Sequence, residues 1–213
     1  MRAQDAGQHF ALRDGVNMNN NNDNLAWNEE NRKTVFSCPI FSVSERFCRP
    51  PGSGQTAGLK TFMVLDTMDW AIVIPARETE RGREFVMVRQ WRHGASELSL
   101  EFPGGVFEKG EDAAAAAARE LREETGFAAG KIEKLGELNP NPAIMSNNVH
   151  FFLATDLKAS MGQQQLDENE YVEVETVPWA QVLSGMGKPP YIHALMGTAL
   201  SLYLGHTGLV RQL

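Results

Sequence analysis

Residues 105–127 read GVFEKGEDAAAAAARELREETGF, and this stretch guides the interpretation of the rest of the chain. The run of alanines from Ala113 to Ala118 has maximal helix propensity. Asp112 is suited to cap the start of a helix, and Gly126 is suited to end it. We therefore predict a helix over residues 112–125.

Three glutamates lie near the end of this predicted helix. Glu120, Glu123 and Glu124 are related by steps of three and four, which place them on one helical face. Like charges so arranged repel each other by roughly a few tenths of a kcal/mol per pair. A solvated acidic face is one interpretation. A bound divalent cation is the other, because carboxylates are hard oxygen donors that match Mg²⁺ or Mn²⁺.

The residues before the helix favour the cation. Leu98–Phe102 is expected to be a short strand, stopped by Pro103, Gly104 and Gly105. Glycines there allow the backbone of the following loop to approach a ligand or metal closely. The pattern is thus a glycine loop followed by a carboxylate-bearing helix.

Elsewhere the sequence alternates between strand and helix patterns. Strands are expected at 59–66, 70–76, 84–92, 131–138, 148–156 and 171–177, with one or two more within 34–49. The charged segment Arg77 to Arg83 is expected to be a hairpin loop, and helices are expected at 178–185 and 191–204. This order predicts an α/β fold in which a mixed sheet packs between helices.

The chain divides into three expected regions. Residues 1–24 are polar, with four consecutive asparagines, and are expected to be disordered. Residues 25–65 are expected to form N-terminal strands, and residues 66–213 the main domain. His150 and His193 lack companions at metal-ligand spacing, so we interpret both as structural.

Composition excludes several classes of protein. The net charge of −7 makes nucleic-acid binding a poor expectation. No apolar run approaches the ~20 residues of a membrane span, and no secretory signal is visible, so a cytoplasmic location is expected. The two cysteines, Cys38 and Cys48, are expected to be reduced thiols, although a local disulfide stays open.

The quoted stretch resembles the box that defines Nudix hydrolases, GX5EX7REUXEEXGU, in which U is a bulky aliphatic residue. The match includes Gly105, Glu111, Arg119, Glu120, Leu121, Glu123, Glu124 and Gly126. Phe127 is aromatic where the pattern favours an aliphatic residue. The resemblance implies an α/β/α sandwich with an N-terminal strand extension. It also implies that Glu120, Glu123, Glu124 and the Gly104 carbonyl bind Mg²⁺, with Mn²⁺ as the alternative, and that Arg119 pairs with Glu111.

Further residues resemble the branch of ADP-ribose pyrophosphatases and nucleoside diphosphate sugar hydrolases. Pro142 lies at about the distance from Gly126 at which that branch has a proline. The segment from Leu166 to Glu170 resembles its acidic loop, so the candidate catalytic carboxylates are Glu168, Glu170 and Glu124, and Glu168 best matches the base. An ordinary turn and an acidic surface loop are the alternative interpretations of these residues. The candidate substrate-binding residues are Arg89, Arg92, Glu101 and Pro142.

The resemblance implies Mg²⁺-dependent hydrolysis of ADP-ribose or a related nucleoside diphosphate sugar to a nucleoside monophosphate and a sugar phosphate. Three alternatives stay open: a GDP-mannose-like substrate, a nucleoside triphosphate, and a non-catalytic nucleotide-binding domain. Related enzymes are dimers that exchange N-terminal strands, so a homodimer is expected, with residues 25–65 as its dimerisation element.

Overall fold

The structure, a computed structural model, describes residues 25–54, 57–108, 110–159, 164–166 and 171–209. The predicted disordered segment 1–24 lies outside the described residues. The chain forms two compact units. The first consists of residues up to Met68 together with Asn141–Asn147, and the second of Asp69–Pro140 and Asn148–Leu213.

The first unit is an antiparallel sheet of three strands, β1 (Asn28–Ser37), β2 (Ser42–Arg49) and β3 (Lys60–Asp66). The region 34–49 therefore contains the end of β1 and all of β2. The segment 141–147 joins the end of β3, because the Leu65 amide donates to the Ile144 carbonyl at 2.7 Å and the Ser146 amide to the Leu65 carbonyl at 3.1 Å. The Asp66 carboxylate accepts from Ser44 and Ser146, which fixes this segment to the sheet.

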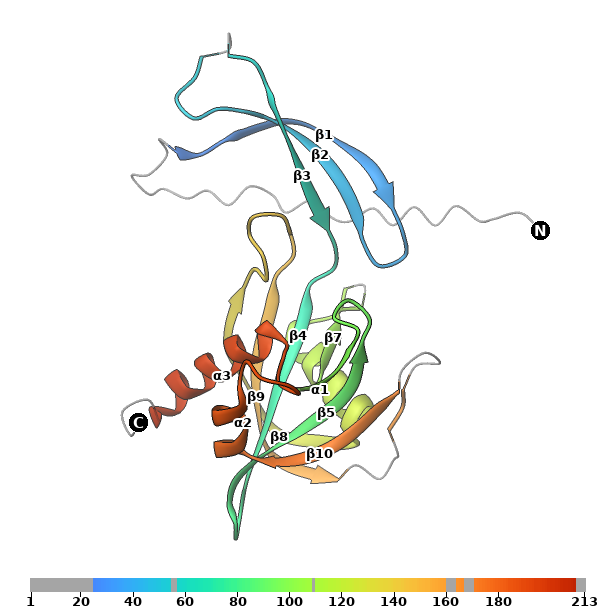
Figure 1. Ribbon diagram of the computed structural model, residues 1–213, viewed down its shortest axis with the longest axis vertical. Coiled ribbons are helices and arrows are strands. Elements are labelled where there is room, and N and C mark those ends of the chain that lie inside the picture. The colour runs from blue at the N-terminus through green and yellow to red at the C-terminus, as the bar shows by residue number, and fades with distance from the viewer. Residues whose placement is uncertain (1–24, 55–56, 109, 160–163, 167–170, 210–213) are drawn as a thin grey trace, which may run out of the picture. The chain divides into compact units, whose positions relative to one another are not determined.

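The second unit is built on a mixed sheet of seven strands, in which β4 and β9 run parallel and the other pairs run antiparallel. The order is β10-β5-β4-β9-β8, with β6 paired to β5 and β7 paired to β4 (Figure 1). The bounds are β4 (Trp70–Thr79), β5 (Gly82–Arg92), β6 (Glu97–Glu101), β7 (Gly104–Val106), β8 (Phe127–Leu138), β9 (Val149–Ala159) and β10 (Val172–Pro178).

Helices cover both faces of this sheet. Side chains alternate along β4, so Ala71 and Val73 pack against α1 (Ala113–Thr125), through Ala116, Ala117 and Leu121. Ile72 and Ile74 face the opposite side, where they share a core with α2 (Trp179–Gly185) and α3 (Ala194–Thr207). Figure 1 shows α1 and the α2–α3 pair on opposite sides of the sheet. The predicted sandwich with a mixed sheet is therefore confirmed.

Two local predictions are wrong. The segment 77–83 is not a loop, because β4 continues to Thr79 and β5 begins at Gly82. The charged residues there form cross-strand ion pairs, Arg77 with Glu84 and Arg83 with Glu78, and such pairs stabilise a hairpin. Gly104 and Gly105 are also not in a loop, since they belong to β7 and pair with Ile72 and Ala71 of β4.

Both cysteines are free, as predicted. Among the described residues, no helix is long and apolar enough to cross a membrane.

Candidate active site

Helix α1 has the ends that the sequence predicted. The Asp112 carboxylate accepts from the Ala114 and Ala115 amides, at 3.0 and 3.3 Å. These bonds satisfy amides that have no partner within the helix. At the other end Gly126 has φ 71°, and its amide donates to the Arg122 carbonyl. The helix therefore ends at a fixed position just after its glutamates.

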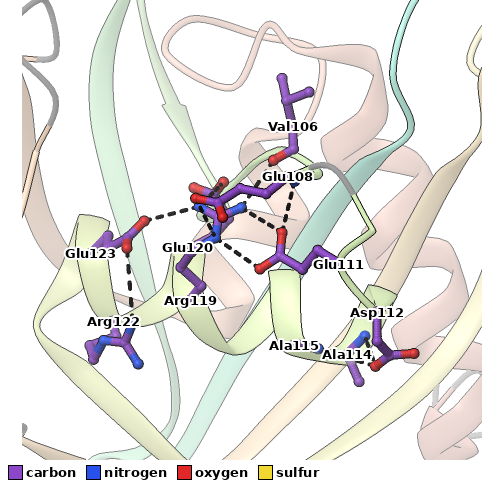
Figure 2. Close-up of polar contacts among 10 residues, drawn as sticks. All are labelled: Val106, Glu108, Glu111, Asp112, Ala114, Ala115, Arg119, Glu120, Arg122 and Glu123. Atoms are coloured by element: carbon purple, nitrogen blue, oxygen red, sulfur yellow. Dashed lines mark hydrogen bonds and ion pairs between the residues drawn. The ribbon is translucent and has the colours of Figure 1, made fainter. Parts of the chain in front are cut away.

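Arg119 is the centre of the site (Figure 2). Its Nε and Nη2 donate to the two oxygens of Glu111, at 2.9 and 3.0 Å, which confirms the predicted ion pair. Its Nη1 donates to Glu120 at 2.8 Å and to Glu123 at 3.0 Å. Nη2 also donates to the Val106 carbonyl at 3.0 Å. These carboxylates raise the pKa of Arg119, so its guanidinium keeps its charge and joins the helix to the preceding loop.

The two glycines of β7 lie against the other glutamates. The Gly104 amide donates to Glu124 Oε2 at 2.9 Å. A side chain at Gly104 would collide with the Ala71 carbonyl, and one at Gly105 would collide with the Glu120 carboxylate. Glu120 and Glu124 are both buried, with 9% and 5% of their surface exposed. At Gly104 the collision is with backbone, so only glycine fits there, whereas a side chain at Gly105 would force the Glu120 carboxylate to move.

The donor set fits a hard divalent cation in its chemistry. Three carboxylates, two of them buried, lie on one turn of α1, and an anion is costly to bury without a cation. Among the described residues, however, no three acidic, histidine or cysteine side chains are arranged as a metal site. Arg119 neutralises Glu120 and Glu123 instead. The predicted ligands are thus brought together but do not converge on one point.

Arg92 and Glu101, two predicted substrate-binding residues, bind each other. Arg92 donates to both oxygens of Glu101, at 2.9 and 2.5 Å, and His193 Nδ1 lies 3.1 Å from Glu101 Oε2. The Glu101 side chain is only 1% exposed. Burial raises the pKa of Glu101, but its hydrogen bonds from Arg92 and His193 outweigh burial and lower the pKa to about 2. Glu101 therefore stays ionised and orients Arg92.

Arg89 projects to the other face of β5. Successive strand residues alternate, so Arg89 shares the face of Phe85 and Met87, which pack towards α3, while Arg92 lies on the face of α1. Arg89 donates to Glu175 of β10. Of the two arginines, Arg92 is the one that lies on the side of the glutamate helix.

The remaining predicted residues belong to the other compact unit or lie outside the described residues. Pro142 lies in the segment that belongs to the first unit. Glu168 and Glu170 are outside the described residues. Residues just before them in sequence reach α1, because the Gln165 amide donates to the Glu123 carbonyl at 3.0 Å and the Gln164 side chain donates to the Glu124 carbonyl.

Sequence reasoning missed the residues that hold the loop between β7 and α1. The Phe107 amide donates to the Asp69 carbonyl at 3.0 Å, and the Phe107 ring packs on His150 with centroids 5.0 Å apart. Asp69 precedes β4 and His150 lies on β9, so no local pattern relates them to the box. Only the parallel pairing of β4 with β9 brings them together.

The sandwich and its acidic helix define an α/β domain with a candidate site for cation-assisted chemistry on phosphates. The family model for the NUDIX domain matches residues 68–196, and the chain belongs to this family. The family predicted from the box is therefore confirmed.

Individual proteins are similar over the same region. The chain is 39% identical to the ADP-ribose pyrophosphatase of Bacillus subtilis (strain 168) over 99 residues, which cover 46% of this chain and 53% of the relative. It is 35% identical to the methanol dehydrogenase activator of Bacillus methanolicus over 91 residues, 43% of this chain and 49% of the relative. The chain thus spans about half the length of these curated relatives.

A solved structure supports the fold. The crystal structure of an ADP compounds hydrolase superposes with a TM-score of 0.71 at 23% identity, covering 85% of this chain and 96% of that chain. At this identity the likeness concerns the fold alone.

Proposed function

We propose that the protein is a Mg²⁺-dependent hydrolase that splits the diphosphate of ADP-ribose, or of a related nucleoside diphosphate sugar, into a nucleoside monophosphate and a sugar phosphate. The observation that supports it most is the group of three glutamates on α1: Glu120 and Glu123 bind Arg119, and Glu124 accepts from the Gly104 amide of β7. The Bacillus subtilis relative that is named ADP-ribose pyrophosphatase supports the substrate class.

The side chains have separable roles in this proposal. Glu120, Glu123, Glu124 and the Gly104 carbonyl would hold the cation. When bound, a divalent cation neutralises charge on the diphosphate and makes water a better nucleophile. Arg119, fixed by Glu111, keeps the loop and the helix in register, and Arg92, oriented by Glu101, binds a phosphate of the substrate from the α1 side of the sheet.

The test is a substrate panel with product identification. Wild-type protein with Mg²⁺ is incubated with ADP-ribose, GDP-mannose and ATP, and the products are separated by chromatography. We expect AMP and ribose 5-phosphate from ADP-ribose. Glu124→Gln should lower the rate by at least about 100-fold, because even residues that only support a metal ligand are worth 10–100-fold. Glu133→Gln, at a half-exposed residue of β8 that pairs with Lys131, is the matched control and should keep full activity.

Other products would support other functions. Release of GMP from GDP-mannose alone would change the substrate within the same chemistry. Inorganic pyrophosphate released from ATP would indicate a triphosphatase. One relative is named an activator of another enzyme. A non-catalytic role is thus a second outcome to test for. Nucleotide binding without turnover of any substrate would favour that alternative and contradict our proposal.

The catalytic base is proposed to be Glu168. Gln165, three residues earlier, is hydrogen-bonded to α1, which supports this part of the chain as its source. Glu168→Gln should lower kcat by about 100-fold or more without changing Mn²⁺ affinity, whereas Glu170→Gln should have a small effect. The reverse result would assign the base to Glu170, and loss of metal binding in Glu168→Gln would make Glu168 a metal ligand instead.

The cytoplasmic location of the protein stays a prediction.

A further inference from the structure

His150 is a nearly buried histidine that lies between two carboxylates outside the NUDIX box. Its Nε2 lies 3.2 Å from Asp69 Oδ2, and its Nδ1 lies 3.3 Å from Glu137 Oε2. Both carboxylates have other donors: Asp69 accepts from the Asn148 amide at 2.8 Å, and Glu137 from Lys134 at 2.8 Å. Asp69, just before β4, therefore holds one side of the imidazole by a hydrogen bond, and Glu137, at the end of β8, lies close to the other side without one.

The imidazole packs on one residue of the box. The rings of His150 and Phe107 have centroids 5.0 Å apart and are tilted by 38°. Phe107 also packs against the apolar core beneath α1, and its amide donates to the Asp69 carbonyl. Asp69 and His150, which touch each other, thus hold the backbone and the side chain of Phe107 respectively.

Phe107 directly follows Val106, a residue that Arg119 contacts. The carbonyl of Val106, the preceding residue, accepts from Arg119 Nη2 at 3.0 Å. The same guanidinium binds Glu120 and Glu123 through Nη1. A displacement of Phe107 would therefore displace Val106, and with it the arginine that sets where two of the three glutamates lie.

We infer that His150 is a positioning residue for the cation site: its ring fixes Phe107 from outside the box and so keeps the box loop in the conformation that the glutamates require. The inference rests on the proposed function, because it assumes that these glutamates bind a divalent cation. It assigns His150 a role that its spacing in the sequence did not indicate.

The experiment compares three substitutions at this position. His150→Ala removes the ring, His150→Gln retains a polar group towards Asp69 without the ring, and His150→Phe retains a ring without the polar contacts. His93→Ala, in the exposed turn between β5 and β6, is the control. Mn²⁺ affinity is measured without nucleotide, from the electron paramagnetic resonance signal of free Mn²⁺. Amide hydrogen exchange of residues 105–112 is measured in metal-free protein.

We expect His150→Ala and His150→Gln to weaken Mn²⁺ binding by about 10-fold, as is typical when a support of a metal site is lost. His150→Phe should stay within about 3-fold of wild type, because it retains the ring that packs on Phe107. Exchange of the Phe107 amide should quicken in the first two variants and not in the control. In turnover, a lowered kcat that returns at high Mg²⁺, with KM for the nucleotide unchanged, would separate positioning from a general loss of structure.

The direction of the change in Mn²⁺ affinity shows whether His150 positions the loop or acts through its charge. If His150 acted through positive charge, its removal would strengthen cation binding. Unchanged or tighter Mn²⁺ binding by His150→Ala would overturn the inference while leaving the proposed function intact. A wild-type protein that binds no Mn²⁺ would instead contradict the cation site itself, and the inference with it. His150→Phe keeps the test valid if the smaller substitutions do not fold.

Discussion

Arg119 is the first residue to test, because one guanidinium contacts Glu111, Glu120 and Glu123. Without it these carboxylates would repel each other. We expect Arg119→Ala to lower the free energy of unfolding by about 2 kcal/mol in metal-free buffer, since the group is partly screened by solvent. Saturating Mg²⁺ should recover part of this loss. Urea unfolding with and without Mg²⁺ measures both effects.

Arg122, on the same helix, is the control for that prediction. Its side chain is 52% exposed and lies 3.9 Å from Glu123, so Arg122→Ala should change stability by less than about 0.5 kcal/mol. An equal loss in both variants would show that helix propensity, rather than the network of Arg119, is being measured.

Glu101 should make stability depend on pH in the acid range. Its pKa is about 2 in the folded protein, against an ordinary value of 4.5. A lowered carboxyl pKa stabilises the fold above pH 4.5, and the contribution is lost as pH falls from about 4.5 to 2. The shift corresponds to about 3 kcal/mol. Wild type should therefore exceed Glu101→Gln by about this amount at pH 7, and the difference should shrink towards pH 2.

Urea unfolding at a series of pH values measures this difference. Arg92→Gln should weaken the same pH dependence, because it removes the hydrogen bonds that lower the Glu101 pKa. A constant difference between wild type and Glu101→Gln at all pH values would contradict the assignment.

Helix α1 requires a glycine at the residue that ends it. Gly126 has φ 71°, a conformation that disfavours any side chain. Gly126→Ala should lower the free energy of unfolding by about 1 kcal/mol. Gly205, inside α3, has nothing within 4 Å of the position of an added Cβ, so Gly205→Ala should raise stability by about 0.5–1 kcal/mol. Thermal unfolding of both variants checks the opposite signs, and the same sign in both would refute the argument.

The whole molecule is predicted to be a homodimer, with an expected mass of about 47 kDa, twice 23.6 kDa. The sheet of the first unit exposes large apolar side chains, including Phe36, Phe62 and Met63 at 52%, 43% and 49%, and exposed apolar side chains of this kind are candidates for burial in an interface. Met63→Glu should shift the mass in sedimentation equilibrium towards the monomer. Leu138→Glu, at a similarly exposed residue of β8, is the control. A monomeric wild type would contradict the prediction.

The sequence by itself determined the elements whose causes are local. Helix α1, its Asp112 cap and its Gly126 end were predictable because the interactions lie within four residues of each other. The residues of the box, which lie within one short stretch from Gly105 to Phe127, likewise indicated the family by resemblance. Most strands were predictable from their β-branched and apolar residues, although their ends were not: the charged segment 77–83 becomes paired strand when its partners lie opposite each other.

Only the tertiary structure decided which side chains meet across the sheet. The pairing of Gly104 with Ile72, the binding of Arg92 to Glu101 and the packing of His150 on Phe107 each join residues from different strands or loops. A sequence pattern records spacing along one strand or helix, whereas these contacts depend on the order and register of strands. The local sequence therefore determines the helix that carries the glutamates, and the order and register of the strands determine which residues surround that helix.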